Sequence, residues 1–213
     1  RINMNKVLLQ VGGGWEEFDL SNKEELEKRN IKIECSAKIG NYVKIGYHVT
    51  IEAYVTIGDY VTIGDGAEIE IDVRIRDRAE IGYHATIGCG AEIGYHATIG
   101  CHAVIRIYAV IGYHAVIRDH AVIRDRAVIR DRATIGCGAV IGYHATIGDR
   151  AMIGDHAEIG YHAIIEEGVE IGDHAEIGYH AMIGCGAVIG RHAEIEEGVV
   201  IKPGKEIDVV IED

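Results

Sequence analysis

The sequence predicts an all-β fold, a single-stranded parallel β-helix in the form of a triangular prism, on two observations. Isoleucine occupies every sixth position from Ile33 to Ile201, 29 times without a miss. The residue two positions before each isoleucine is nearly always Ala or Val, so the hexads read [Ala/Val]-x-Ile-Gly-x-x. A short period kept without any insertion is typical of a stacked β-helix.

Each hexad contains a short strand followed by a corner. Alternate residues of a strand point to the same side, so the isoleucine and the Ala or Val two residues earlier face inward, and the residue between them faces outward. Three hexads close one triangular coil, and the whole repeat therefore makes nine to ten coils. At about 4.8 Å per stacked strand, the prism is roughly 45 Å long.

Glycine and histidine mark the corners. Of the 28 glycines, 18 directly follow the isoleucine and seven lie at the third residue after it. All 12 histidines lie at this third position too. Glycine adopts positive φ freely, and histidine is among the other residues enriched there. We therefore expect a left-handed backbone conformation at the third residue after each isoleucine.

Segments outside the repeat suggest one domain with caps. We expect an N-terminal cap of one strand and a short helix over residues 1–30, the β-helix over 31–204, and a C-terminal cap strand within 205–213. The departure from the pattern at Lys205 marks the end of the repeats, with a last strand over Ile207–Ile211.

The N-terminal cap has recognisable local signals. Lys6–Val11 reads as a strand, and Gly12–Gly14 reads as a turn. Ser21-Asn22-Lys23-Glu24 has the pattern of a capping box, which predicts a short helix from there to about Arg29. We expect this segment to cover the open apolar end of the prism.

Composition restricts partners and compartment. The formal net charge of −13 argues against nucleic acid or an anionic membrane as a partner. No apolar run is long enough to span a membrane and no signal peptide is visible, so a cytoplasmic protein is expected. The nearest cysteines in one column, Cys101 and Cys137, are two coils apart, about 9–10 Å. A disulfide needs Cα atoms within about 7 Å, so we expect none and a reducing compartment.

Residues at the same place in successive coils stack into columns, and one outward column is almost entirely apolar. Tyr-His pairs stand at the corner that leads into this face. A continuous apolar stripe rimmed by Tyr and His indicates an interface, and we expect a homo-oligomer packed through it. The alternative is that Val and Ile simply favour strands, buried or not. The expected interface residues are Val110, Val128, Tyr143, Thr146, Tyr161, Ile164, Tyr179, Met182 and Val200.

The hexads, such as Ala79-Glu80-Ile81-Gly82-Tyr83-His84, resemble those of the hexapeptide-repeat left-handed β-helix superfamily of acyltransferases and related proteins. The resemblance covers about 80% of the chain. It implies a left-handed coil, against the usual right-handed preference for crossovers. It also implies a trimer with parallel prism axes and active sites between subunits, where a histidine acts as general base.

Two functions remain open on this basis. The absence of any loop between residues 31 and 204, and of any histidine that departs from its copies, favours a structural or scaffold protein without a cofactor. The alternative is an acetyltransferase that uses a coenzyme A thioester. Its candidate bases are His144, His162 and His180, because they border the expected interface and imidazole titrates near neutral pH.

A native metal site is not expected. In the β-helical carbonic anhydrases of this superfamily, three histidines hold zinc and two of them are five residues apart. Here the spacings are multiples of six, as between His96 and His102, which places such residues on different corners. Residues His84, His102 and His120, and likewise His156, His174 and His192, are expected to stack into ladders, which alone do not make a tetrahedral site.

Overall fold

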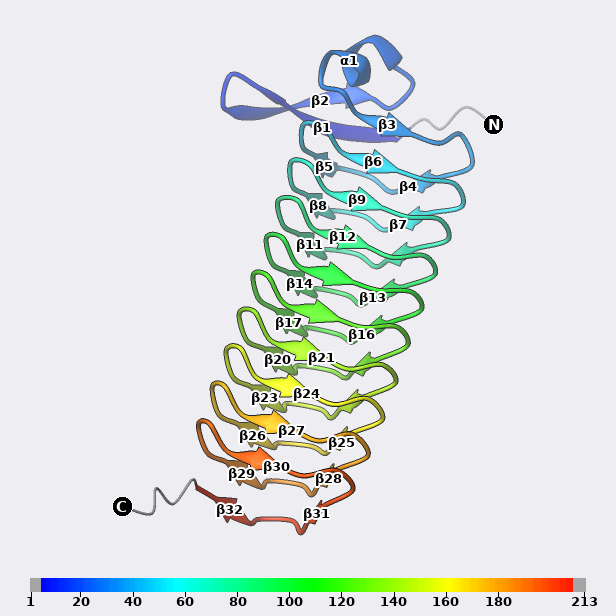
Figure 1. Ribbon diagram of the computed structural model, residues 1–213. Helices are drawn as coiled ribbons and strands as arrows, with labels where there is room; N and C mark the ends of the chain where they lie inside the picture. Colours follow the sequence, from blue (N-terminus) through cyan, green and yellow to red (C-terminus); the bar gives the residue numbers. More distant parts are fainter. Residues whose placement is uncertain (1–4, 209–213) are drawn as a thin grey trace.

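The computed structural model describes residues 5–208 as a prism whose three sides are parallel β-sheets (Figure 1). The coils follow one another from the blue cap to the red C-terminal end, and the chain winds left-handed along the axis (Figure 1). The predicted fold class is confirmed. We name the sheets A, B and C, and each corner by the two sheets that it joins.

Sheet A begins with two cap strands and continues along one side of the prism. Its strands, in spatial order, are β2 (Gly14–Asp19), β1 (Lys6–Val11), β5 (Val43–Ile45), β8 (Thr62–Ile63), β11 (Glu80–Ile81), β14 (Thr98–Ile99), β17 (Val116–Ile117), β20 (Thr134–Ile135), β23 (Met152–Ile153), β26 (Glu170–Ile171), β29 (Val188–Ile189) and β32 (Glu206–Ile207).

Sheets B and C each contain ten two-residue strands. Sheet B consists of β3 (Lys32–Ile33), β6 (Thr50–Ile51), β9 (Glu68–Ile69), β12 (Thr86–Ile87), β15 (Val104–Ile105), β18 (Val122–Ile123), β21 (Val140–Ile141), β24 (Glu158–Ile159), β27 (Glu176–Ile177) and β30 (Glu194–Ile195). Sheet C consists of β4 (Lys38–Ile39), β7 (Thr56–Ile57), β10 (Arg74–Ile75), β13 (Glu92–Ile93), β16 (Val110–Ile111), β19 (Val128–Ile129), β22 (Thr146–Ile147), β25 (Ile164–Ile165), β28 (Met182–Ile183) and β31 (Val200–Ile201).

The inward residues form one continuous core. Each isoleucine of the six-residue period from Ile39 to Ile195 is at most 7% exposed. Successive coils pair strand on strand in one constant register, for example Ile123 with Ile141 and Ile141 with Ile159. Because every isoleucine stacks on another, the outward residues are also held in columns, with one residue from each coil.

The corners have the backbone conformation that the sequence predicts. All 12 histidines have φ between 55° and 62°. The side-chain carboxylates of several corner aspartates also accept hydrogen bonds from the backbone of the preceding coil, as between the Asp155 Oδ1 and the Cys137 N–H at 2.9 Å. These contacts between coils were not foreseen from the sequence.

The N-terminal cap contains an element that the sequence did not reveal. β1 is confirmed at its predicted bounds, but it forms an antiparallel hairpin with β2, which the sequence analysis missed. Gly12 and Gly13, at φ 55° and 87°, make the turn. β1 also pairs in parallel with β5, which attaches the hairpin to sheet A.

The cap helix α1 (Lys23–Lys28) lies where a short helix is expected. Its N-cap is Asn22, whose side chain accepts from the Glu25 N–H at 3.3 Å. The expected cap, Ser21, instead donates its hydroxyl to Asp19, so the helix is capped one residue later than predicted. Leu26 is buried beneath the helix.

At the other end, β32 pairs in parallel with β29 and so continues sheet A beyond Gly204. The remainder of the C-terminal strand expected over Ile207–Ile211 lies outside the described residues.

Truncation of one buried isoleucine tests the importance of the core. Ile129→Ala is expected to lower the free energy of unfolding by about 2–5 kcal/mol, because the neighbouring coils cannot collapse into the space left behind. The control, Val128→Ala, changes an adjacent outward side chain and should cost less than about 1 kcal/mol. Urea unfolding measures both, and equal costs would contradict the inward assignment.

Candidate functional site

Three histidines stack at corner B–C in successive coils. The rings of His144 and His162 lie 5.0 Å apart at 8°, and those of His162 and His180 lie 5.1 Å apart at 1°. We call these three residues the histidine ladder. All three residues are at least partly exposed, so the ladder is open to a ligand. The stacking predicted for these candidate residues is thus present.

Three tyrosines in one column, Tyr143, Tyr161 and Tyr179, stand beside the histidines, and we call them the tyrosine ladder. The rings of Tyr161 and Tyr179 are parallel within 3° and 4.8 Å apart. Tyr161 also meets His180 edge-on at 5.4 Å. Each ladder therefore restricts the orientation of the rings in the other.

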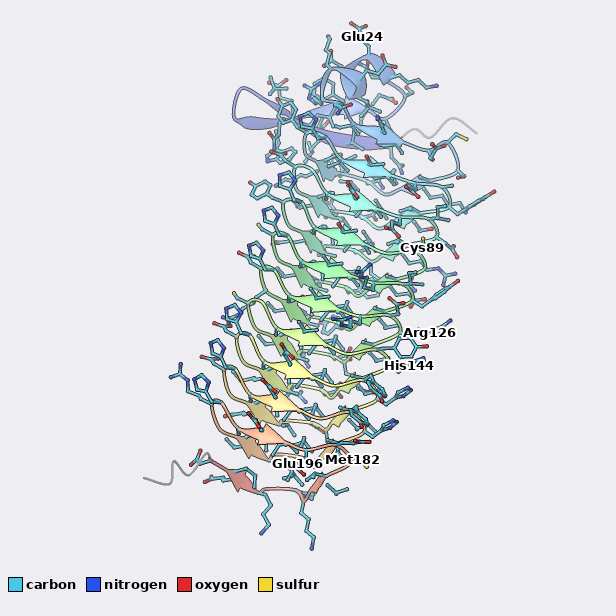
Figure 2. All side chains as sticks on the ribbon, in the orientation of Figure 1. Glu24, Cys89, Arg126, His144, Met182 and Glu196 are labelled. Carbon is cyan, nitrogen blue, oxygen red and sulfur yellow. The ribbon has the colours of Figure 1, made fainter. Side chains whose placement is uncertain are left out.

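An arginine lies at the N-terminal end of both ladders. Arg126 occupies the histidine position one coil earlier, and its guanidinium donates to the Tyr143 hydroxyl at 3.3 Å. Figure 2 shows Arg126 and His144 one above the other on the same edge of the prism. The positive charge of Arg126 thus lies beside the first histidine of the ladder.

A groove of about 710 Å³ runs along sheet B beside the tyrosine ladder. Its opposite side is the glutamate column, Glu158, Glu176 and Glu194, which pair in register on adjacent strands. The space between them exists because Gly142, Gly160 and Gly178 follow the isoleucines there and carry no side chain. At the two ends of the groove, Arg124 and Glu196 occupy the position that these glycines have in the coils between.

The sequence analysis placed these columns but did not find the groove. The signal was present in the column that directly follows the sheet B isoleucines, which changes from Arg124 to three glycines and then to Glu196. A run of glycines flanked by long side chains predicts a hollow between them.

The Tyr179 hydroxyl at the C-terminal end of the groove has a negative neighbour. It is hydrogen-bonded to the Glu197 carboxylate, which raises the pKa of Tyr179. The phenol therefore stays neutral at physiological pH.

The expected interface residues other than the tyrosines lie together on the other side of the histidine ladder. The outward residues of sheet C from Val110 to Val200 form the apolar column, in which Ile164, Met182 and Val200 are 39%, 38% and 63% exposed. The column is in continuous register from Val110 to Val200. Tyr143, Tyr161 and Tyr179 stand at the corner that leads into this column.

Histidines at the other two corners also stack, and hollows lie beside them too. Tyr113 lies 6.3 Å from His96 and 4.0 Å from His114, next to a groove of about 200 Å³. A groove of about 400 Å³ follows a run of glycines along sheet A. The rings of His84 and His102 are 5.1 Å apart, and those of His156 and His174 are 5.1 Å apart, both at corner A–B. His96 and His114 stack at 4.7 Å on corner C–A. Among residues 5–208, no group of three or more His, Cys, Asp or Glu side chains is arranged to hold a metal ion.

Two cysteines have carboxylate partners that the sequence analysis missed. The Cys89 thiol donates to Glu70 at 3.2 Å, and the Cys185 thiol donates to Glu166 at 3.0 Å. Each carboxylate raises the pKa of its thiol. In both contacts the glutamate directly follows an isoleucine, and the cysteine is the second residue after the isoleucine of the next coil. A glutamate and a cysteine 19 residues apart at these positions could therefore have predicted the contact from the sequence. All five cysteines are unpaired in the structure.

Two family models match the chain. The model described as the GMPPB C-terminal domain matches residues 123–210, and that of the bacterial transferase hexapeptide (six repeats) matches residues 30–64. No curated protein matches the chain.

Among solved structures, the UDP-N-acetylglucosamine acyltransferase from Campylobacter jejuni superposes with a TM-score of 0.61 at 22% identity, over 72% of this chain and 69% of that chain. The Francisella novicida UDP-N-acetylglucosamine acyltransferase gives 0.48 at 23% identity, over 62% and 63%. The acetyltransferase domain of PglB from Neisseria gonorrhoeae gives 0.45 at 20% identity, over 63% and 56%.

The likeness to the Campylobacter enzyme is a likeness of fold. The chain spans less than two thirds of the length of the Francisella and Neisseria proteins. With its repeat and its coil, the chain has the fold of the hexapeptide-repeat left-handed β-helix proteins, and the hexapeptide model matches part of it, residues 30–64. In residues 5–208, no helix has the length and apolar character needed to cross a membrane.

The Cys185–Glu166 contact predicts slow alkylation of this thiol. At pH 8 the raised pKa of Cys185 lowers its thiolate fraction, and only the thiolate attacks iodoacetamide. Glu166→Gln should lower the pKa and speed alkylation of Cys185 at least about twofold, as followed by peptide mass spectrometry. Exposed Cys35 is the internal control. An unchanged rate at Cys185, or an equal gain at Cys35, would contradict the contact.

Proposed function

We propose that the chain is an acyltransferase that uses an acyl thioester of coenzyme A, with its site at corner B–C. The observation that carries this proposal is the position of the histidine ladder beside the tyrosine-lined groove of about 710 Å³. A histidine at the rim of a hollow is what an acyl-transfer site needs and a filled structural interface lacks.

The imidazole acts as general base in this proposal. A neutral histidine takes the proton of an acceptor hydroxyl or amine as that group attacks the thioester carbonyl. The carbon–sulfur bond then breaks, and the thiol of coenzyme A leaves with a proton. Among the three candidates, His162 has the most aromatic contacts, with Tyr143 at 5.9 Å and Tyr161 at 5.6 Å, which hold its ring in place.

The charges at the groove give its two ends different roles. Arg124 and Arg126, at the N-terminal end, suit the phosphates of coenzyme A because guanidinium binds phosphate oxygens in a fork. Glu158, Glu176 and Glu194 would repel phosphates. We therefore place the donor at the arginine end and leave the acidic end for another ligand.

A homotrimer packed through the apolar column would complete the site. The column adjoins the histidine ladder, so a neighbouring subunit seated on Ile164 and Met182 would form a second wall for the substrates. Three large apolar side chains at 38–63% exposure support a covered face rather than a solvated one.

A scaffold function is the second candidate, and one observation favours it. All 29 hexads from Ile33 to Ile201 follow each other without a loop, so no inserted segment forms a substrate pocket. In that case the trimer would be a rigid rod, and the histidine ladders would serve corner geometry alone.

Substitution of one histidine ladder, compared with substitution of another, distinguishes the acyltransferase from the scaffold function. The variant His144→Asn/His162→Asn/His180→Asn removes the proposed bases, and asparagine tolerates the positive φ of these corners. Release of the coenzyme A thiol from acetyl-CoA, measured with a panel of amines and alcohols, should fall at least about 100-fold.

The matched control changes the ladder at corner A–B, as His156→Asn/His174→Asn/His192→Asn, and should keep full activity. An equal loss in both variants would indicate damage to the fold. No acceptor-dependent thiol release by the unchanged protein would overturn the enzyme proposal and leave the scaffold function.

A further inference from the structure

The acidic side of the groove repeats at the spacing of the strands. Glu158, Glu176 and Glu194 are exposed, pair in register and face the same way from sheet B. Rings at the adjacent corner stack at a similar spacing, 4.8 Å between Tyr161 and Tyr179 and 5.1 Å between His162 and His180. Three carboxylates therefore stand in a row about 10 Å long, at two strand spacings.

The other side of the groove is aromatic. Tyr143, Tyr161 and Tyr179 line it. Tyr161 and Tyr179 share their coils with Glu158 and Glu176, whereas Tyr143 lies one coil earlier. Aromatic faces attract ammonium groups and also pack against methylene chains. A ligand in the groove thus meets carboxylates on one side and rings on the other, both with the repeat of the coil.

The surroundings reinforce the negative charge. Residues 155–197 contain ten Asp and Glu but only one Lys or Arg, Arg191, besides five histidines. Two further carboxylates, those of Glu196 and Glu197, lie next to the C-terminal end of the glutamate column, near Tyr179. Charge complementarity therefore requires a ligand with several positive charges along its length.

The spacing distinguishes between kinds of cationic ligand. Amines joined by three methylene groups are about 5 Å apart in extended form, from standard bond lengths. Side chains on one face of an extended peptide are about 6.7 Å apart, which does not fit the row. We infer that the groove is a docking site for a linear polyamine with three-carbon spacers, lying along the prism axis.

This site does not rest on the acyl-transfer proposal. The glutamate column belongs to sheet B, on another face of the prism from the apolar column of sheet C. The groove shares only the tyrosines at corner B–C with the expected subunit contact. Binding needs no acyl donor, so it can be measured independently of any reaction.

Isothermal titration of the whole 213-residue chain with norspermidine tests the inference. Norspermidine carries three amines with three-carbon spacers, and 1,7-diaminoheptane has the same length without the central charge. We expect norspermidine to bind at least fivefold more tightly than the diamine, and its affinity to fall with added salt.

The matched variants change one charge each. Glu176→Gln, in the middle of the column, should remove most of the preference for norspermidine over the diamine. Glu170→Gln, an exposed glutamate of sheet A outside the groove, should leave it unchanged.

Three results would overturn the inference. These are no binding of norspermidine at millimolar concentration, equal affinity for triamine and diamine, or an equal loss of affinity in Glu170→Gln. Binding of oligolysine without binding of norspermidine would instead indicate a peptide partner and would also reject the polyamine.

Discussion

The stacking of each inward isoleucine on the matching isoleucine of the next coil is the interaction on which the rest of this molecule depends. It fixes the register between coils, as in the pairs from Ile105 through Ile123 to Ile141. Once that register is fixed, every outward position is copied along the prism at the strand spacing. Columns of like residues then arise from repetition alone, without any loop to arrange them.

The backbone conformation of the corners also determines where histidine ladders can form. The positive φ at the third residue after isoleucine limits the choice to Gly and a few side chains, and histidine is one of these. Ladders of histidine are therefore first a result of corner geometry. The ladder of His144, His162 and His180 differs from the others through the column of glutamates across the groove, since tyrosines and glycines lie beside other ladders as well.

Structural features that follow from the six-residue period could be predicted from the sequence. Features that arise from contacts between residues far apart in the chain could not. The six-residue isoleucine period was sufficient for the sheets, the register and the stacking of the histidines. Strand β2 was missed because Gly14-Trp15-Glu16-Glu17 lacks the alternation of a strand. The groove was missed because its concavity results from the absent side chains of residues such as Gly160, in columns that only the three-dimensional stack brings side by side.

We propose that function lies in columns created by the register between coils. Ile164→Glu/Met182→Glu places two charges in the apolar column of sheet C. Met152→Glu/Val188→Glu places two charges at the same outward strand position on sheet A.

The molar mass of these two folded variants in solution, measured by light scattering, tests this claim most directly. We predict a monomer for the sheet C variant, whose apolar column is interrupted by charge, and a trimer for the sheet A variant. The same mass for both variants would contradict it.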